Sequence, residues 1–262
     1  MLNPTQIDII KQAIAQTERR VFVADVEGTK MIIKRHEPAR GYHRYVLLKG
    51  VSKIFNLPAL APVPAPGGAA AQAIEIQRLA TLRNAGVPVP ELLHVEPDWI
   101  AISYEGQYSI GRTIEKGDKP SVYWEQGLAA ILDVHQKGQN LSQVFIRNAM
   151  WHDNRVVFID FEDDPAASIG LANAQTRDWL FYLYSSAWML EIPPADAAKI
   201  MFKYLHQDNA DVQKIVFDSL GALKWLRHLP SQRKPWGRDI LALHRVGKVL
   251  HEMSVLNQQH RT

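Results

Sequence analysis

The sequence has 262 residues, with 30 Lys and Arg against 27 Asp and Glu, and it contains no cysteine. A chain of this length with 47% hydrophobic and 22% charged residues can bury a full core as one large domain or two small ones, which excludes a disordered protein. The missing cysteine excludes disulfides, thiolate zinc sites, iron–sulfur clusters and a thiol nucleophile, and a net charge of +3 is too small to predict nucleic-acid binding by itself.

Short apolar segments and turn signals alternate over the first 105 residues. Residues 20–26 and 30–35 are rich in β-branched side chains, and the turn Glu27-Gly28-Thr29 between them predicts a hairpin. Residues 69–85 predict a strong helix that ends at Gly86. The other elements expected here are a helix over 4–16, strands over 92–95 and 99–104, a mixed apolar and basic helix over 41–57, and a linker rich in Pro, Ala and Gly over 58–68.

Helical patterns dominate the rest of the chain. A helix over 121–137 is closed by Gly138, and a short buried strand is expected over 155–159. The remaining helices are expected over 177–190, 195–206, 211–228 and 238–258. Strands first and helices afterwards are typical of the α+β class, so we predict a small sheet-bearing lobe over 1–105 and a helical lobe over 106–262.

The N-terminus does not have the basic and then apolar order of a signal peptide, since it reads MLNPTQIDIIK. The longest uncharged run, 54–74, is interrupted by four prolines and is a poor candidate for a spanning helix. We therefore expect a cytoplasmic protein without a membrane span.

Two polar residues in the second half suggest a chemical role. Asp160 follows the apolar strand Val156-Val157-Phe158-Ile159, and Asn148 precedes it by one hairpin. Magnesium prefers oxygen ligands and takes only one or two carboxylates from protein when phosphates fill its other positions. The pair therefore suits a divalent ion on a phosphate, although a plain hairpin with an acidic loop would read the same way. Lys34 and Glu75 are ambiguous when taken alone, because each is equally consistent with an exposed side chain.

These residues belong to an ordered series of short motifs. The series comprises Lys34 in MIIKR, Glu75 in AIEIQRLATLRNAGVPVP, Tyr104-Glu105-Gly106, His135-Gln136-Lys137-Gly138, Asn148, Asp160-Phe161-Glu162 and Arg177-Asp178-Trp179. Over about residues 20–190 this order resembles the protein-kinase-like superfamily, especially its compact atypical bacterial branch. That branch includes lipopolysaccharide core kinases, Kdo-kinase-like proteins, Bud/RIO-type proteins and aminoglycoside phosphotransferases.

The resemblance implies a two-lobed kinase-like fold that binds ATP and Mg²⁺ in the cleft between lobes. Lys34 would hold the α- and β-phosphates and pair with Glu75, and Glu105 would lie in the hinge that contacts the nucleotide. Asn148 and Asp160 would bind magnesium. Asp178 would brace the catalytic loop from the following core helix.

Two departures from the family pattern bear on activity. The base position, five residues before Asn148, is Gln143, and an amide cannot take a proton near neutral pH. No glycine-rich loop precedes Lys34, because the turn there holds only Gly28 beside Glu27. The transition state of phosphoryl transfer is loose, so positioning and charge neutralisation dominate and a substitute carboxylate such as Asp153 or Glu162 could serve.

Three functions follow as hypotheses. The first is an ATP-dependent phosphotransferase acting on a small molecule, a sugar, or an envelope lipid or lipopolysaccharide. The second is a pseudokinase, a nucleotide-binding or scaffold protein without turnover. The third and least favoured is nucleic-acid binding through the basic segment 224–238, whose Trp225 and Trp236 are more often core or interface residues in such patterns.

The insert over 40–68 combines apolar residues with four basic ones and no acidic residue. Such a segment suits the periphery of an anionic membrane surface, and packing against the small lobe is the alternative. The acceptor of the phosphoryl group and the oligomeric state are not encoded in any pattern of the sequence. Metalloprotease and serine-hydrolase chemistry is disfavoured, since the sequence has no H-E-x-x-H and no G-x-S-x-G.

Overall fold

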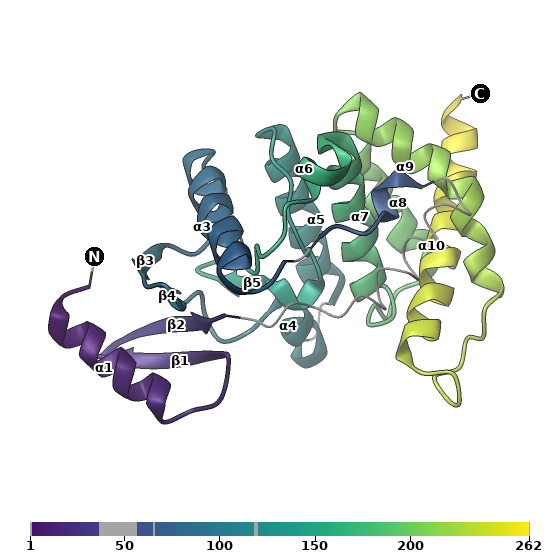
Figure 1. Cartoon of the computed structure of the whole chain (residues 1–262). Coiled ribbons are helices and arrows are strands. Elements are labelled where there is room, and N and C mark those ends of the chain that lie inside the picture. The colour runs from purple at the N-terminus through teal and green to yellow at the C-terminus, as the bar shows by residue number, and fades with distance from the viewer. Residues whose placement is uncertain (1, 37–56, 65, 118–119, 262) are drawn as a thin grey trace.

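The structure is a computed structural model that describes residues 2–36, 57–64, 66–117 and 120–261. Its N-terminal part contains a four-stranded antiparallel sheet in the order β1-β2-β4-β3 (Figure 1). The strands are β1 (Val21–Val26), β2 (Thr29–Arg35), β3 (Leu92–Val95) and β4 (Trp99–Ser103). The predicted hairpin is confirmed, because β1 and β2 pair through Val26 and Thr29 with only Glu27 and Gly28 between them.

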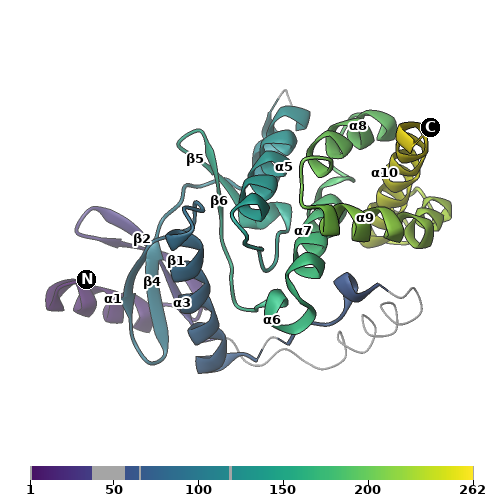
Figure 2. The same ribbon diagram turned by 90° about the horizontal axis from the view of Figure 1, so that it is seen from above.

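Helices cover both faces of this sheet (Figure 2). On one face α1 (Pro4–Ala15) contributes Ile10 to a small apolar cluster with Met31 and Ile33 of β2. On the other face lies α3 (Gly68–Asn84), which follows the 3₁₀ turn η1 (Pro58–Leu60). Because side chains alternate across a strand, Ile32 and Lys34 point to the face opposite Met31 and Ile33. Lys34 is therefore directed toward the side of the sheet that α3 occupies.

Within the described residues, the C-terminal part consists of helices and one two-stranded hairpin. Its hairpin is formed by β5 (Ala149–His152) and β6 (Arg155–Phe158), which are preceded by the 3₁₀ turn η2 (Ile146–Asn148). Its helices are α4 (Ile110–Lys116), α5 (Pro120–Gln136), α6 (Pro165–Ile169), α7 (Leu171–Ser186), α8 (Pro194–Leu205), α9 (Ala210–Leu223) with the 3₁₀ turn η3 (Lys224–His228), and α10 (Arg238–Arg261).

One apolar core connects the two parts. Leu82 of α3 and Ile100 of β4 belong to the same buried cluster as Trp124 of α5, Trp179 of α7 and Leu250 of α10. Each of these five side chains is at most 3% exposed, so the sheet and the helical part share an apolar interior. This shared core holds β2, α3, the β5–β6 hairpin and α7 in fixed positions around the site described below.

The predicted α+β class is confirmed, with a small sheet in the N-terminal part and helices after it. The sequence did not predict α4, β5 or α6, which are seven residues long or shorter, and α7 begins at Leu171 instead of residue 177. The helix expected over 41–57 lies almost wholly outside the described residues, and the linker over 58–68 contains η1. No helix within the described ranges is long and apolar enough to cross a membrane.

Candidate active site

The Lys34 and Glu75 side chains meet between β2 and α3. Lys34 Nζ donates to Glu75 Oε1 at 2.6 Å, and the two residues are only 7% and 2% exposed. Glu75 lies on the face of α3 that also buries Leu79 and Leu82, which explains why a glutamate can reach the sheet from this helix. The predicted pair is therefore formed, and it is buried.

Two further carboxylates reach the same lysine. Lys34 Nζ lies 3.4 Å from Asp160 Oδ1 and 3.1 Å from Glu162 Oε1, and Glu162 Oε1 also lies 2.5 Å from Arg20 Nη1. Burial by itself would lower the pKa of Lys34, but the three carboxylates outweigh it and raise that pKa. Burial raises the pKa of Glu75, and Lys34 opposes this rise. The site is thus a dense charge cluster in which Lys34 contacts all three carboxylates and Arg20 also contacts Glu162.

Asn148 and Asp160 also come together, as the sequence predicted. The residues flank the β5–β6 hairpin, and Asn148 Nδ2 lies 3.4 Å from Asp160 Oδ2. Asp160 has a left-handed backbone (φ +77°), a conformation that Asp tolerates better than most residues. This turn directs the carboxylate toward Asn148 and Lys34 at the same time.

The donor set of this pair fits magnesium. Asn148 offers an amide oxygen and Asp160 a carboxylate, both of them hard oxygen ligands, and one or two protein carboxylates suffice when phosphates complete the coordination. The side chain of Asp160 is 22% exposed and remains accessible from the adjoining cavity.

A cavity of about 250 Å³ adjoins these residues. Its charged and polar lining includes Lys34, Asn148 and Asp160, together with Arg20 and Glu105. The rest of the lining includes apolar side chains and the connection that follows β4, namely Ile32, Ile102, Met150 and residues 103–106. A cavity with a broad apolar wall and a few convergent polar groups is the usual form of a small-molecule site.

The predicted hinge residue Glu105 lines this cavity. Its carboxylate accepts a 2.5 Å hydrogen bond from Ser103 Oγ, so the side chain is turned back onto the end of β4. Glu105 is therefore present at the cavity, and in this arrangement its carboxylate is occupied by the neighbouring serine.

Gln143, at the predicted base position, lies in the loop between α5 and η2. Its main-chain carbonyl oxygen accepts a hydrogen bond from Asn148 Nδ2 at 2.8 Å, and its side-chain Nε2 lies 3.4 Å from Asp163 Oδ2. Asp153, a suggested substitute base, occupies the turn at the far end of the hairpin, four residue pairs from Asn148, with a side chain 77% exposed. The hairpin therefore places Asp153 at its exposed end, away from the Asn148 end.

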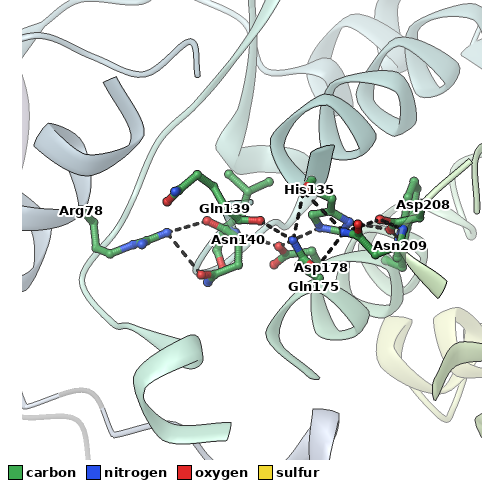
Figure 3. Close-up of polar contacts among 10 residues, drawn as sticks. Arg78, His135, Gln139, Asn140, Gln175, Asp178, Asp208 and Asn209 are labelled. Atoms are coloured by element: carbon green, nitrogen blue, oxygen red, sulfur yellow. Dashed lines mark hydrogen bonds and ion pairs between the residues drawn. The ribbon is translucent and has the colours of Figure 1, made fainter. Parts of the chain in front are cut away.

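Behind this loop lies a buried hydrogen-bond network centred on His135 (Figure 3). His135 Nδ1 is 2.7 Å from Asp208 Oδ2, and His135 Nε2 is 3.3 Å from Asp178 Oδ2. Asp178 Oδ2 also accepts from the Leu141 backbone N–H at 2.7 Å, and Asp208 Oδ2 accepts from Trp179 Nε1 at 2.7 Å. The aspartate of the Arg177-Asp178-Trp179 motif therefore does brace the loop that contains Gln143.

Burial controls the ionisation of this network. Burial raises the pKa of Asp178 to about 6, with His135 and the Leu141 N–H opposing the rise. For His135, burial would lower the pKa, but hydrogen bonds and charge from Asp178 and Asp208 raise it overall. An imidazole that faces carboxylates through both ring nitrogens satisfies both only as the cation, which donates from each nitrogen.

Arg78 connects this network to the Lys34–Glu75 pair. It lies one turn after Glu75 on α3 and donates from Nη2 to the Asn140 carbonyl oxygen at 2.6 Å (Figure 3). One helix therefore holds Lys34 through Glu75 and the Gln143 loop through Arg78. Sequence reasoning missed Arg78, and its only signal was the i, i+3 spacing from Glu75.

The two tryptophans of the basic segment 224–238 lie at the surface. Trp225 is 43% exposed and Trp236 is 60% exposed. Of the two places expected for them, core or interface, their exposure excludes the core, because their segment connects α9 to α10 at the surface.

The α+β fold thus brings a lysine–glutamate pair and an asparagine–aspartate pair together beside one cavity. No family model matches the sequence. The chain is 22% identical over 255 residues to an uncharacterized protein of Haemophilus influenzae (strain ATCC 51907 / DSM 11121 / KW20 / Rd), an alignment that covers 95% of this chain and 97% of that protein.

Proposed function

We propose that this protein is an ATP-dependent phosphotransferase of the protein-kinase-like type. The proposal depends on one observation above all. Lys34 contacts both Glu75 and Asp160, and Asp160 contacts Asn148, although these four residues come from four separate segments of the chain. A buried lysine that is held by one glutamate and reaches a second, accessible carboxylate is the arrangement needed to bind phosphates beside a metal ion.

The residues divide the work as follows. Lys34 would hold the α- and β-phosphates, and Glu75 would keep the lysine in place. Asn148 and Asp160 would hold Mg²⁺, which supplies neutralisation of the charge on the transferring phosphoryl group. The apolar wall formed by Ile32, Ile102 and Met150 suits the flat face of a nucleotide base.

The acceptor remains a small molecule, a sugar, or an envelope lipid or lipopolysaccharide within this proposal. Contact with an anionic membrane surface through the insert over 40–68 is part of it, as is a cytoplasmic location. Most of that insert lies outside the described residues.

A pseudokinase is the second candidate, favoured by two observations. Residue 143 is an amide, and Glu162 occupies the same Lys34 ammonium group that the phosphates would need, at 3.1 Å. If Glu162 held the lysine too firmly, nucleotide would bind weakly or without turnover.

A thermal-shift titration tests the nucleotide site common to both candidates. Mg·ATP at about 100 times its Kd stabilises the folded state by about 2.7 kcal/mol, which corresponds to a rise in Tm of roughly 5–10 °C for a chain of this size. Asp160→Asn should reduce the magnesium-dependent part of the rise, whereas Asp196→Asn, an exposed position on α8 paired with Lys199, should leave it unchanged. If no nucleotide raises Tm with or without Mg²⁺, the proposal fails.

A further inference from the structure

Two loops that are distant in the sequence lie against each other beside Asp160. Ser142 Oγ donates to the Asp163 carbonyl oxygen at 2.6 Å, and Gln143 Nε2 contacts Asp163 Oδ2 at 3.4 Å. Asp163 is only 6% exposed, so its side chain is directed inward. Residue 143 is the position where a kinase-like sequence would carry an aspartate. In this structure the carboxylate of Asp163 lies next to it.

The same loop is joined to the predicted magnesium pair. The Asn148 side-chain amide donates to the Gln143 carbonyl oxygen at 2.8 Å and lies 3.4 Å from Asp160 Oδ2. The Gln143–Asp163 pair and the Asn148–Asp160 pair therefore belong to one contact network.

The two substitutes considered from the sequence are placed differently from Asp163, which is the carboxylate in contact with Gln143. Asp153 lies in the exposed turn at the far end of the β5–β6 hairpin. Glu162 Oε1 is held by both Lys34 and Arg20, at 3.1 and 2.5 Å, and two cations on one carboxylate disfavour its protonation.

We propose that Asp163 is the proton acceptor of the phosphoryl transfer and that Gln143 positions the acceptor hydroxyl; this rests on the function proposed above. An amide can orient a hydroxyl but cannot take its proton, whereas a carboxylate can. The hydroxyl proton passes to Asp163 while the hydroxyl oxygen forms a bond to the γ-phosphorus. The bond from that phosphorus to the β–γ bridging oxygen breaks, ADP leaves with the electron pair, and the proton on Asp163 later returns to solvent.

Asp163→Asn tests this role while keeping the local structure. Asparagine has nearly the same shape and can still accept from Gln143 Nε2, but it cannot take a proton. With Mg·ATP as the probe and water as the acceptor, we expect ADP release to fall by about 100-fold or more, because general base catalysis contributes roughly 10²–10⁴-fold. The rise in Tm with Mg·ATP should remain as in the wild type.

A rescue and a neighbouring control complete the experiment. Adding Gln143→Asp to Asp163→Asn restores a carboxylate at the adjoining position and should recover at least part of the lost rate. Asp164→Asn is the control, since Asp164 accepts from the Ala167 N–H at the start of α6 and should leave ADP release unchanged.

The outcomes separate this inference from the proposed function. Two results with Asp163→Asn would overturn the role of Asp163 as proton acceptor. One is a wild-type rate of ADP release, and the other is the loss of both ADP release and the nucleotide-dependent rise in Tm. So would a wild-type protein that binds Mg·ATP but releases no ADP, although nucleotide binding would then stand. If the wild type shows no nucleotide-dependent shift, the proposed function itself fails.

Discussion

Lys34→Met is expected to destabilise the protein by about 3–5 kcal/mol at pH 7, because removing one partner of a buried ion pair leaves the other charge uncompensated. The stranded group is Glu75, which is 2% exposed and loses its 2.6 Å contact with the ammonium group. Glu75 can escape only by taking up a proton. Protonating a group of normal pKa 4.5 at pH 7 costs about 3.4 kcal/mol at 1.36 kcal/mol per pH unit, which agrees with that range.

The loss should depend on pH in a definite direction. Without Lys34 the pKa of Glu75 in the folded state rises further above its unfolded value, so the folded state binds the proton more tightly. Stability of the variant therefore falls as pH rises above about 4.5 and recovers below it. Urea unfolding of the wild type and the variant between pH 4 and 8 measures this, and the difference between them should shrink toward pH 4.

Two further variants serve as controls. Lys30 lies on the same strand at an exposed position. Lys30→Met should therefore lower the free energy of unfolding by less than about 0.5 kcal/mol, as most surface substitutions do. Adding Glu75→Gln to Lys34→Met removes the stranded charge and should recover most of the stability at pH 7. A Lys34→Met loss that is small and independent of pH would show that the lysine is not the counter-ion of Glu75.

Asp178→Ala is expected to cost a similar amount, about 3–5 kcal/mol, because it breaks a buried charged network. The substitution leaves the Leu141 N–H without its acceptor and leaves His135 with Asp208 alone. Both of those contacts end on the single atom Asp178 Oδ2. Asp178→Asn can keep an oxygen there and should cost less, about 1–2 kcal/mol, as expected when a charged hydrogen-bond acceptor becomes neutral.

The pH dependence of the wild type provides a second measure of this network. The pKa values of His135 and Asp178 are both raised, so the folded state binds these protons more tightly than the unfolded chain does. Stability should then fall as pH rises, between about 4 and 6 for Asp178 and above about 6.5 for His135. Asp178→Ala should flatten this decline.

The matched control is Asp133→Asn, on the same helix as His135. Asp133 forms an exposed i, i+4 pair with Lys137, and its loss should cost about 0.3–0.5 kcal/mol. Equal losses in the two variants would contradict the importance assigned to the network.

The sequence predicted those parts of the fold that have strong local signals. Gly28 and the β-branched segments on either side of it predicted the β1–β2 hairpin. The apolar periodicity of long helices such as α5 and α10 predicted those helices. The short elements α4 and β5 escaped prediction because seven and four residues carry too little periodicity. The start of α7 was also missed, because Gly170 ends α6 and caps α7 at once and so obscures the boundary.

The site was predictable only where a motif singled out a residue. Asn148 and Asp160 were found from their places around an apolar strand, Lys34 and Glu75 were found through the resemblance, and the structure brings the four together. Asp163 and Asp208 carry no local signal, since their partners lie at least 20 positions away in sequence, and Arg78 has only its spacing from Glu75. Only the tertiary fold reveals that a carboxylate from the loop after β6 lies beside Gln143.

The most direct test of a kinase-like nucleotide site is a crystal structure of the protein with Mn²⁺ and a non-hydrolysable ATP analogue. Manganese substitutes for magnesium among oxygen ligands and can be located by its anomalous scattering. We predict manganese coordinated by Asn148 and Asp160, with the phosphates in contact with Lys34 and the base in the cavity lined by Ile32, Ile102 and Met150. A nucleotide bound elsewhere, or a cavity that stays empty at saturating analogue, would contradict the proposal.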